Sequence, residues 1–138
     1  MSSGIAVDPA CIEVFQDLKL KHKYRFVIFK VNDDKTSIVV DQTAGAETTY
    51  DEFVAMLPAD DCRYVVYDFE WTAEGEGQRN KILFISWSPD TSRIKSKMIY
   101  ASSKDTLKKS LVGLAKDVQA TDQSEIDYQT VFDIVTRV

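Results

Sequence analysis

Two nearly continuous apolar stretches in the middle of the chain limit its possible folds more than any other feature. Residues 62–71, CRYVVYDFEW, and residues 81–87, KILFISW, are rich in the β-branched and aromatic side chains that favour strands. The polar residues 72–80 between them include two glycines, which is typical of a hairpin tip. Because strands that are apolar on both faces need cover on both sides, this hairpin predicts a sheet between two layers of helices.

Strand and helix signals alternate along the rest of the chain. Asp8 and Pro9 predict the start of a helix that runs to about residue 19, and Thr49 with Glu52 forms a capping box for a short helix that ends near residue 56. Further patterns predict a hairpin of residues 24–31 and 37–40, a strand at residues 118–120, and a last helix that begins after Asp127 and carries Val131, Ile134 and Val135. The predicted fold class is α/β (α+β), with a mixed central β-sheet of about five strands sandwiched by helices. We expect a single domain over residues 1–138, with a flexible N-terminus at residues 1–6.

The composition argues against several classes of function. The chain has 138 residues, 44% of them hydrophobic, which is enough for one core without disulfides or metal. Cys11 and Cys62 are expected to be reduced and buried, and together with His22 they are too scattered for a zinc site. His22 is the only histidine and lies between two lysines, so we expect a solvated side chain, no catalytic constellation, no cofactor and no enzymatic activity. The chain has neither a signal peptide nor an apolar run near the roughly 20 residues of a membrane span, which predicts a cytoplasmic protein that is not integral to a membrane.

Positive charge is concentrated in one segment of an otherwise acidic chain. The formal net charge is −5, yet residues 93–109 contain six basic side chains and one acidic one. Apolar residues at helical spacing predict a helix there, with a kink at Ser102 and Ser103 because the second apolar face is rotated from the first. The two apolar faces are Ile94, Met98 and Ala101, and then Leu107, Leu111 and Leu114. Beside them the helix places a basic stripe of Arg93, Lys97, Lys104 and Lys108.

A basic stripe has several possible partners. Any single lysine can simply be solvated. The sequence pI of 4.9 argues against nucleic acid, because nothing would neutralise the remaining acidic surface near a polyanion. Anionic lipid headgroups and an acidic protein surface both fit the pattern. The residues alone leave these two open.

Four segments resemble the actin-depolymerising factor/cofilin family. They are SGIAV at residues 3–7, DCRYVVYDFE at 61–70, RNKILFISW at 79–87 and WSPDTSRIKSKMIYASSKDTLKKSL at 87–111. The resemblance runs through the whole chain and implies a single ADF-homology (gelsolin-like) domain that acts as a monomer. It implies a protein that binds monomeric and filamentous actin, preferably ADP-actin, and that severs and depolymerises filaments.

The resemblance also implies two actin-binding surfaces and a regulatory site. The surface for monomer and filament would comprise Ser3, Gly4, Ile5, Lys95, Lys97, Met98, Lys104, Asp105 and Asp122. The surface for the filament alone would comprise Arg79, Lys81, Asp133 and Arg137. Phosphatidylinositol 4,5-bisphosphate would contact Lys95, Lys97, Lys104, Lys108 and Lys109, and Ser3 would be the site of regulatory phosphorylation. A filament-disassembly cofactor protein is a further expected partner.

Three positions depart from the family pattern. Arg93 stands where many members have proline, and Ile134 stands where some have a basic residue. The basic insertion that serves as a nuclear-import signal in some members is missing after His22, so nuclear import is not implied. Two alternative functions remain: a phosphoinositide-responsive membrane-binding module, and a non-severing actin binder of the coactosin or glia maturation factor type.

Overall fold

One six-stranded sheet organises the described part of the chain. The computed structural model describes residues 4–137. The sheet has the strand order β1-β3-β2-β4-β5-β6, in which β1 and β6 are parallel to their neighbours and the other pairs are antiparallel. The strands are β1 (Ala6–Val7), β2 (Phe26–Val31), β3 (Ser37–Ala44), β4 (Arg63–Ala73), β5 (Gly77–Trp87) and β6 (Lys116–Ala120). The helices are α1 (Pro9–Lys21), α2 (Tyr50–Met56), α3 (Ile94–Ser110), α4 (Gln123–Ile126) and α5 (Tyr128–Thr136).

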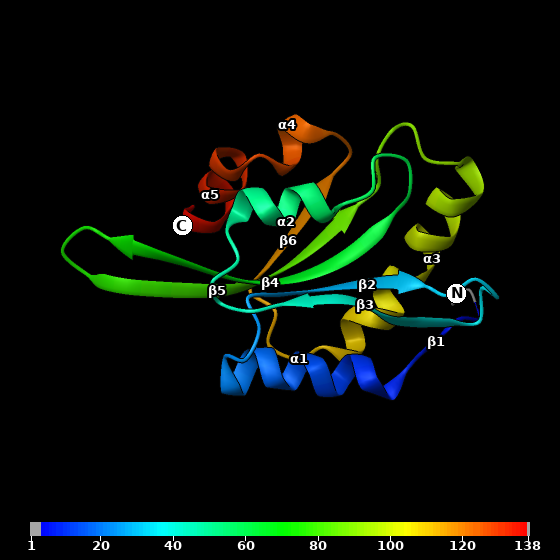
Figure 1. Cartoon of the computed structure of the whole chain (residues 1–138), viewed down its shortest axis with the longest axis horizontal. Helices are drawn as coiled ribbons and strands as arrows, with labels where there is room; N and C mark the ends of the chain where they lie inside the picture. Colours follow the sequence, from blue (N-terminus) through cyan, green and yellow to red (C-terminus); the bar gives the residue numbers. More distant parts are fainter. Residues whose placement is uncertain (1–3, 138) are drawn as a thin grey trace.

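Helices cover both faces of the sheet, as the apolar strands predict (Figure 1). One face packs against α1 and α3, where Phe15 and Leu107 are fully buried. The other face packs against α2, α4 and α5, where Phe53 and Val131 are fully buried. Successive residues of β4 and β5 therefore enter two different cores, which explains why both strands are apolar almost throughout.

The β4–β5 hairpin is longer than its sequence predicts. Residues 72–80 were expected to form a polar loop, but β4 continues to Ala73 and β5 begins at Gly77, with Ala73 opposite Gly77. The turn is short because Gly75 and Gly77 adopt positive φ angles of 76° and 78°, which are open to glycine. The polar side chains are those of a strand pair exposed to solvent, and the hairpin projects beyond the rest of the sheet (Figure 1).

The structure corrects the expected elements at three further places. A sixth strand, β1, pairs with β3, and Ile5 before it is only 6% exposed, so the chain is anchored before residue 6. The short helix α4 was not predicted. Helix α3 ends at Ser110, so Leu111 and Leu114 lie beyond it rather than on its second apolar face. The helix is continuous through Ser102, whose hydroxyl donates to the Ile99 carbonyl at 3.1 Å, and the kink stays a prediction.

The predicted helix starts are confirmed. Asp8 caps α1 by accepting from the Ala10 amide at 2.9 Å, and Asp127 caps α5 by accepting from the Gln129 amide at 3.2 Å. Thr49 and Glu52 form the predicted capping box of α2.

The two cysteines and the single histidine of the chain also lie as the sequence predicts. Cys11 and Cys62 are free and buried, and burial raises the pKa of the Cys11 thiol to about 11. The side chain of His22 is mostly exposed at the end of α1, where its backbone has a positive φ of 53°. No helix between residues 4 and 137 is long and apolar enough to cross a bilayer.

Candidate functional site

Helix α3 turns an apolar stripe toward solvent. Ile94 is 75% exposed and Met98, one turn later, is 66% exposed. Ala101 continues this stripe and is also exposed. The opposite side of the helix, which holds it on the sheet, is made by the buried residues Tyr100, Ser103 and Leu107. The first of the two predicted apolar faces is therefore a solvent face, and large exposed side chains of this kind mark interaction sites.

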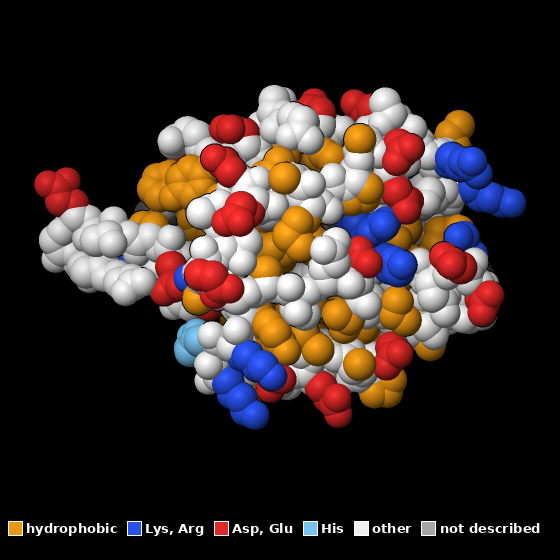
Figure 2. Space-filling model, in the orientation of Figure 1, with side chains coloured by type: hydrophobic (Ala, Val, Ile, Leu, Met, Phe, Trp, Pro, Cys, Tyr) orange, Lys and Arg blue, Asp and Glu red, His pale blue; other side chains and the backbone are white. Residues whose placement is uncertain are grey.

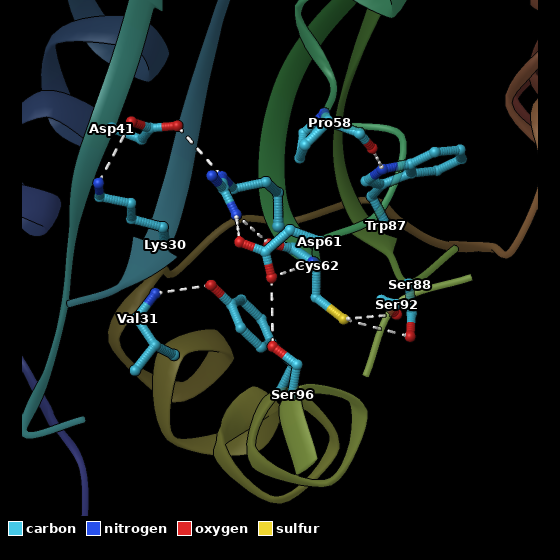
Figure 3. A network of polar contacts seen from close by, with 12 residues as sticks. Lys30, Val31, Asp41, Pro58, Asp61, Cys62, Trp87, Ser88, Ser92 and Ser96 are labelled. Carbon is cyan, nitrogen blue, oxygen red and sulfur yellow. Dashed lines mark hydrogen bonds and ion pairs between the residues drawn. The ribbon is translucent and has the colours of Figure 1, made fainter. Parts of the chain in front are cut away.

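A polar network under the first turns of α3 holds this stripe in place (Figure 3). Asp61 accepts from the Ser96 hydroxyl at 3.2 Å and from Arg63 at 2.7 Å. Arg63 also donates to Asp41 on β3 at 3.2 Å, so the helix is tied to two strands. Burial alone would raise the pKa of Asp61, but hydrogen bonds from Arg63, the Cys62 amide and Ser96 outweigh it and lower that pKa.

Two tyrosines fix the middle of α3 to the sheet. The Tyr100 hydroxyl accepts from the Val31 amide on β2 at 2.9 Å, and the Tyr64 hydroxyl on β4 donates to the Tyr100 carbonyl. Their ring centroids are 5.0 Å apart. Burial raises the pKa of Tyr100, and it raises that of Tyr64 beyond any physiological pH, so both hydroxyls stay protonated. The helix is therefore presented on a rigid support.

The three lysines of the predicted basic stripe all have partners within the protein. Lys95 is exposed beside the apolar stripe, and Lys97 donates to the Asp90 carbonyl at 2.8 Å. Lys104 and Lys108 both pair with Asp117 on β6, at 3.2 and 2.5 Å. Local sequence patterns do not predict that Asp117 faces α3, because its direction depends on the register of β6. Burial would raise the pKa of Asp117, but hydrogen bonds and charge from these two lysines lower it.

The Asp117 carboxylate should make the attachment of α3 depend on pH. Because its pKa is lower in the folded protein than in the unfolded chain, where it is about 3.9, its contribution is complete above that value and is lost as the pH falls further. Asp117→Asn should lower the free energy of unfolding at pH 7 by about 0.5–1 kcal/mol, after allowance for solvent screening. Urea unfolding between neutral and acid pH should show a shallower pH dependence than in the parent. Asp105→Asn on the exposed side of α3 is the matched control, and equal slopes in both variants would contradict this role.

The structure gathers most of the residues expected to bind both monomer and filament. Strand β1 contacts α3, and Ile5 just before it is buried in the same core as Tyr100 and Leu107 of the helix. Gly4 is exposed with φ 82°, a conformation that other residues rarely adopt. Lys104 is half-buried against β6, while Asp105 is exposed on the solvent side of α3. Ser3 lies outside the described residues.

Asp122 reaches the same end of the molecule through the loop after β6. The Thr121 carbonyl accepts from the Asp90 amide at 3.1 Å, and the Asp90 carbonyl accepts from Lys97. Asp122 itself caps α4 by accepting from the Glu125 amide at 2.9 Å. Hydrogen bonds from the Ser124 hydroxyl and this amide lower the pKa of Asp122. Its carboxylate therefore also stabilises the start of α4, a role that the resemblance to the family does not imply.

A second surface lies on the β4–β5 hairpin and α5. Arg79, Lys81 and Arg137 line one groove of about 630 Å³ together with Trp71 and Phe132. Arg79 pairs with Glu76 at 3.2 Å. Lys81 donates to the Val135 carbonyl at 2.9 Å and lies 5.9 Å from the centre of the Trp71 ring. Asp133 is exposed on α5, where Gln129 donates to it at 3.0 Å.

The two surfaces lie at different ends of the molecule (Figure 1). In Figure 2, basic and hydrophobic side chains stand together at the edge that α3 occupies in Figure 1. The five lysines expected to contact phosphoinositide all belong to α3, but the pairing of Lys104 and Lys108 with Asp117 reduces their free charge. At the two departures from the family pattern, Arg93 gives α3 no capping hydrogen bond and Ile134 packs against the second core.

The covered sheet presents one helix, α3, whose exposed apolar stripe beside lysines has the character of a protein-binding surface. Residues 4–136 match the family described as "Cofilin/tropomyosin-type actin-binding protein". A cofilin of Schizosaccharomyces pombe is 55% identical over 135 residues, which cover 98% of this chain and 97% of that protein.

Solved structures agree with this match. The crystal structure of Streptomyces griseoflavus cofilin superposes with a TM-score of 0.91 at 43% identity, covering 97% of this chain and 98% of that one. Plasmodium berghei actin depolymerization factor 2 superposes with a TM-score of 0.86 at 32% identity, covering 99% and 100%. The chain belongs to the cofilin/actin-depolymerising factor family, and the resemblance seen in its sequence motifs is confirmed.

Proposed function

We propose that this protein binds actin monomers and filaments and depolymerises the filaments, with helix α3 as its main contact. The observation that carries this proposal is the exposed pair Ile94 and Met98 on a helix held rigidly by the sheet. Its membership of a family of actin-binding proteins, with cofilins among its relatives at about half identity, supports the same partner.

The geometry suggests how α3 would bind. Ile94 and Met98 would enter an apolar cleft on actin, and burial of each side chain is worth about 1.5–3 kcal/mol before the costs of association. Lys95 and Lys97 flank the stripe and would meet the acidic surface of actin, which raises the rate of encounter. Because Tyr100 and Asp61 already fix the helix, little conformational entropy is lost on binding.

The groove of Arg79, Lys81 and Arg137 would contact a second actin subunit, with Asp133 nearby on α5. A molecule with contacts at both ends of one sheet can bridge two successive subunits of a filament. Preference for ADP-actin, a change of filament twist and severing at the edges of decorated segments are the activities that we propose for this arrangement.

Arg79→Ala should separate filament binding from monomer binding. Arg79 is half exposed and, among residues 4–137, its ion pair is with the neighbouring Glu76 of the hairpin, so its loss should change the free energy of unfolding by less than about 0.5 kcal/mol. Filament affinity should fall by about tenfold while monomer affinity is unchanged. Lys81→Ala is a less specific test because Lys81 also supports the end of α5. A parallel loss of both affinities in Arg79→Ala would contradict the two-surface arrangement.

Phosphorylation at Ser3 would oppose binding. A phosphate adds about −1.5 to −2 charges. Ile5, two residues after Ser3, is buried in the core beneath α3, and a phosphate on Ser3 would add negative charge to a protein that we propose binds an acidic partner. Ser3→Glu should weaken actin binding by roughly 1–3 kcal/mol at low salt and less at high salt, whereas Ser3→Ala should bind normally. Fluorescence titration of labelled actin monomers measures both, and parent-like binding by Ser3→Glu at low salt would contradict this switch.

We also propose two further partners and a cellular location, and one alternative function remains. Phosphatidylinositol 4,5-bisphosphate would compete with actin for the lysines of α3, and a filament-disassembly cofactor protein would act on the decorated filament. The protein would work in the cytoplasm on the actin cytoskeleton. A non-severing binder of the coactosin type would bind filaments without shortening them.

Co-sedimentation with filamentous actin distinguishes these functions. The proposed function predicts that the protein pellets with filaments and that actin moves into the supernatant as its concentration rises. Binding without polymer loss would favour the non-severing alternative. Absence of binding to both actin forms would contradict the proposal.

A further inference from the structure

Ser86 is a polar residue that is buried inside the sheet. It lies in β5 between Tyr64 on β4 and Gln119 on β6, so all three side chains point to the α3 face. Ser86 is 8% exposed, and its hydroxyl oxygen has no hydrogen-bond partner within the described residues 4–137. A buried hydroxyl without a partner destabilises a fold, so its place in the central sheet calls for a ligand or another explanation.

A cavity lies between α3 and the edge of the sheet, and Ser86 is one of the residues that line it. It has a volume of about 260 Å³, and the residues around Ser86 include Lys97, Ala101 and Lys104 of α3 and Gln119 of β6. The volume is below the range usual for drug-sized ligands, so it suits a compact molecule. The Tyr64 and Tyr100 side chains form an aromatic wall.

The lining of the cavity is rich in hydrogen-bond donors and cations. Arg63, Lys97 and Lys104 border it, and none of the described residues that line it is Asp or Glu. Arg63 is paired with Asp41 and Asp61 outside the lining, so Lys97 and Lys104 supply most of the available positive charge. Each ammonium can donate three hydrogen bonds. Lys97 makes one with the Asp90 carbonyl, and Lys104 pairs with Asp117, so both have donors to spare. A ligand that supplies several acceptor oxygens and negative charge complements this lining.

We propose that this cavity is a binding site for a small soluble oxyanion, a compact carboxylate or phosphate compound, with the Ser86 hydroxyl as its deepest contact. The site differs from the exposed lysines of α3 because it lies beneath them and is built on a buried side chain. Lys97 and Lys104 belong to both this cavity and the expected actin surface. A bound anion would therefore compete with actin, and this consequence, unlike the site itself, rests on the proposed function.

The site can be tested without actin by recording amide NMR spectra of the isotopically labelled protein during titration with citrate and with inorganic phosphate. At least one of them should shift the amide signals of Ser86, Ala101 and Gln119 in a saturable manner, and uncharged glycerol should not. Ser86→Ala keeps the space but removes the hydroxyl, and Ser86→Val also fills part of the cavity. Binding should weaken several-fold in the first and at least about tenfold in the second. Ser102→Ala, an exposed serine on α3, is the matched control and should bind as the parent does.

Three results would overturn the site: no saturable shift with either anion, equal affinity in Ser86→Val and the parent, or shifts centred on the exposed Lys95 and Lys109. Vesicles of phosphatidylcholine with phosphatidylinositol 4,5-bisphosphate form a separate arm. Vesicle binding that needs Ser86, without binding of the soluble anions, would overturn a soluble ligand. In a final arm, the bound anion should lower the affinity for monomeric actin in the parent but not in Ser86→Val. Failure of the parent to bind actin without anion would count against the proposed function alone.

Discussion

Replacing Lys95 and Lys97 together by alanine is expected to weaken binding to both monomeric and filamentous actin by about thirtyfold or more. Lys95 is exposed next to Met98, and within the described part of the chain Lys97 donates a single hydrogen bond, to the Asp90 carbonyl. Loss of the two charges removes long-range attraction to the partner and direct contacts with it. The binding free energy should weaken by about 2 kcal/mol or more. The free energy of unfolding should change by less than about 1 kcal/mol.

A matched control separates this effect from a general loss of charge. Lys21→Ala with Lys23→Ala removes the same net charge near the end of α1 and should leave both actin affinities unchanged. Binding to labelled actin monomers and co-sedimentation with filaments measure the outcome. Unchanged monomer affinity in the Lys95 and Lys97 variant would show that α3 is not the contact helix.

Leu107→Ala is expected to have the largest effect on stability among single changes on α3. Leu107 is fully buried between α3 and the sheet, in the core that also contains Phe84 and Leu111. Its truncation should lower the free energy of unfolding by about 2–5 kcal/mol. Met98→Ala on the opposite side of the same helix should change it by less than about 0.5 kcal/mol.

The same two variants should show the reverse order in actin binding. Met98→Ala removes an anchor of the proposed contact and should weaken monomer binding by at least about tenfold. Leu107→Ala, measured at a temperature where it remains folded, should retain most of its affinity. Urea denaturation and monomer titration provide both values, and a Met98→Ala protein that binds like the parent would contradict the exposed stripe as a binding site.

Much of the fold follows from local patterns in the sequence. The apolar runs around Val65 and Phe84 predict a sheet covered on both faces, and the caps at Asp8, Thr49 and Asp127 predict three helix starts. Strand β1 was missed because it contains two residues and depends on pairing with β3 rather than on its own composition. The end of α3 was placed too late because Leu111 and Leu114 continue the helical spacing while they pack from the following loop.

Local sequence patterns predict less of the functional surface than of the fold. Periodicity places Ile94, Met98 and Ala101 on one face of α3, but it cannot tell that this face points to solvent while Ser103 enters the core. Pairing of Lys104 and Lys108 with Asp117 depends on tertiary register. The assignment of these residues to actin came from the resemblance to a family, and the structure adds which of them are exposed and which also support the fold.

Methyl NMR of methionine can show whether the exposed stripe of α3 enters the actin contact. The chain has three methionines. Met98 lies in the stripe, whereas Met56 ends α2 on the other side of the sheet and serves as an internal reference. When unlabelled ADP-actin monomers, kept from polymerising, are added to the methyl-labelled protein, the Met98 signal should shift or broaden far more than the Met56 signal. A complex in which the Met98 signal keeps the position and width expected of an exposed methyl group would contradict burial of this stripe against actin.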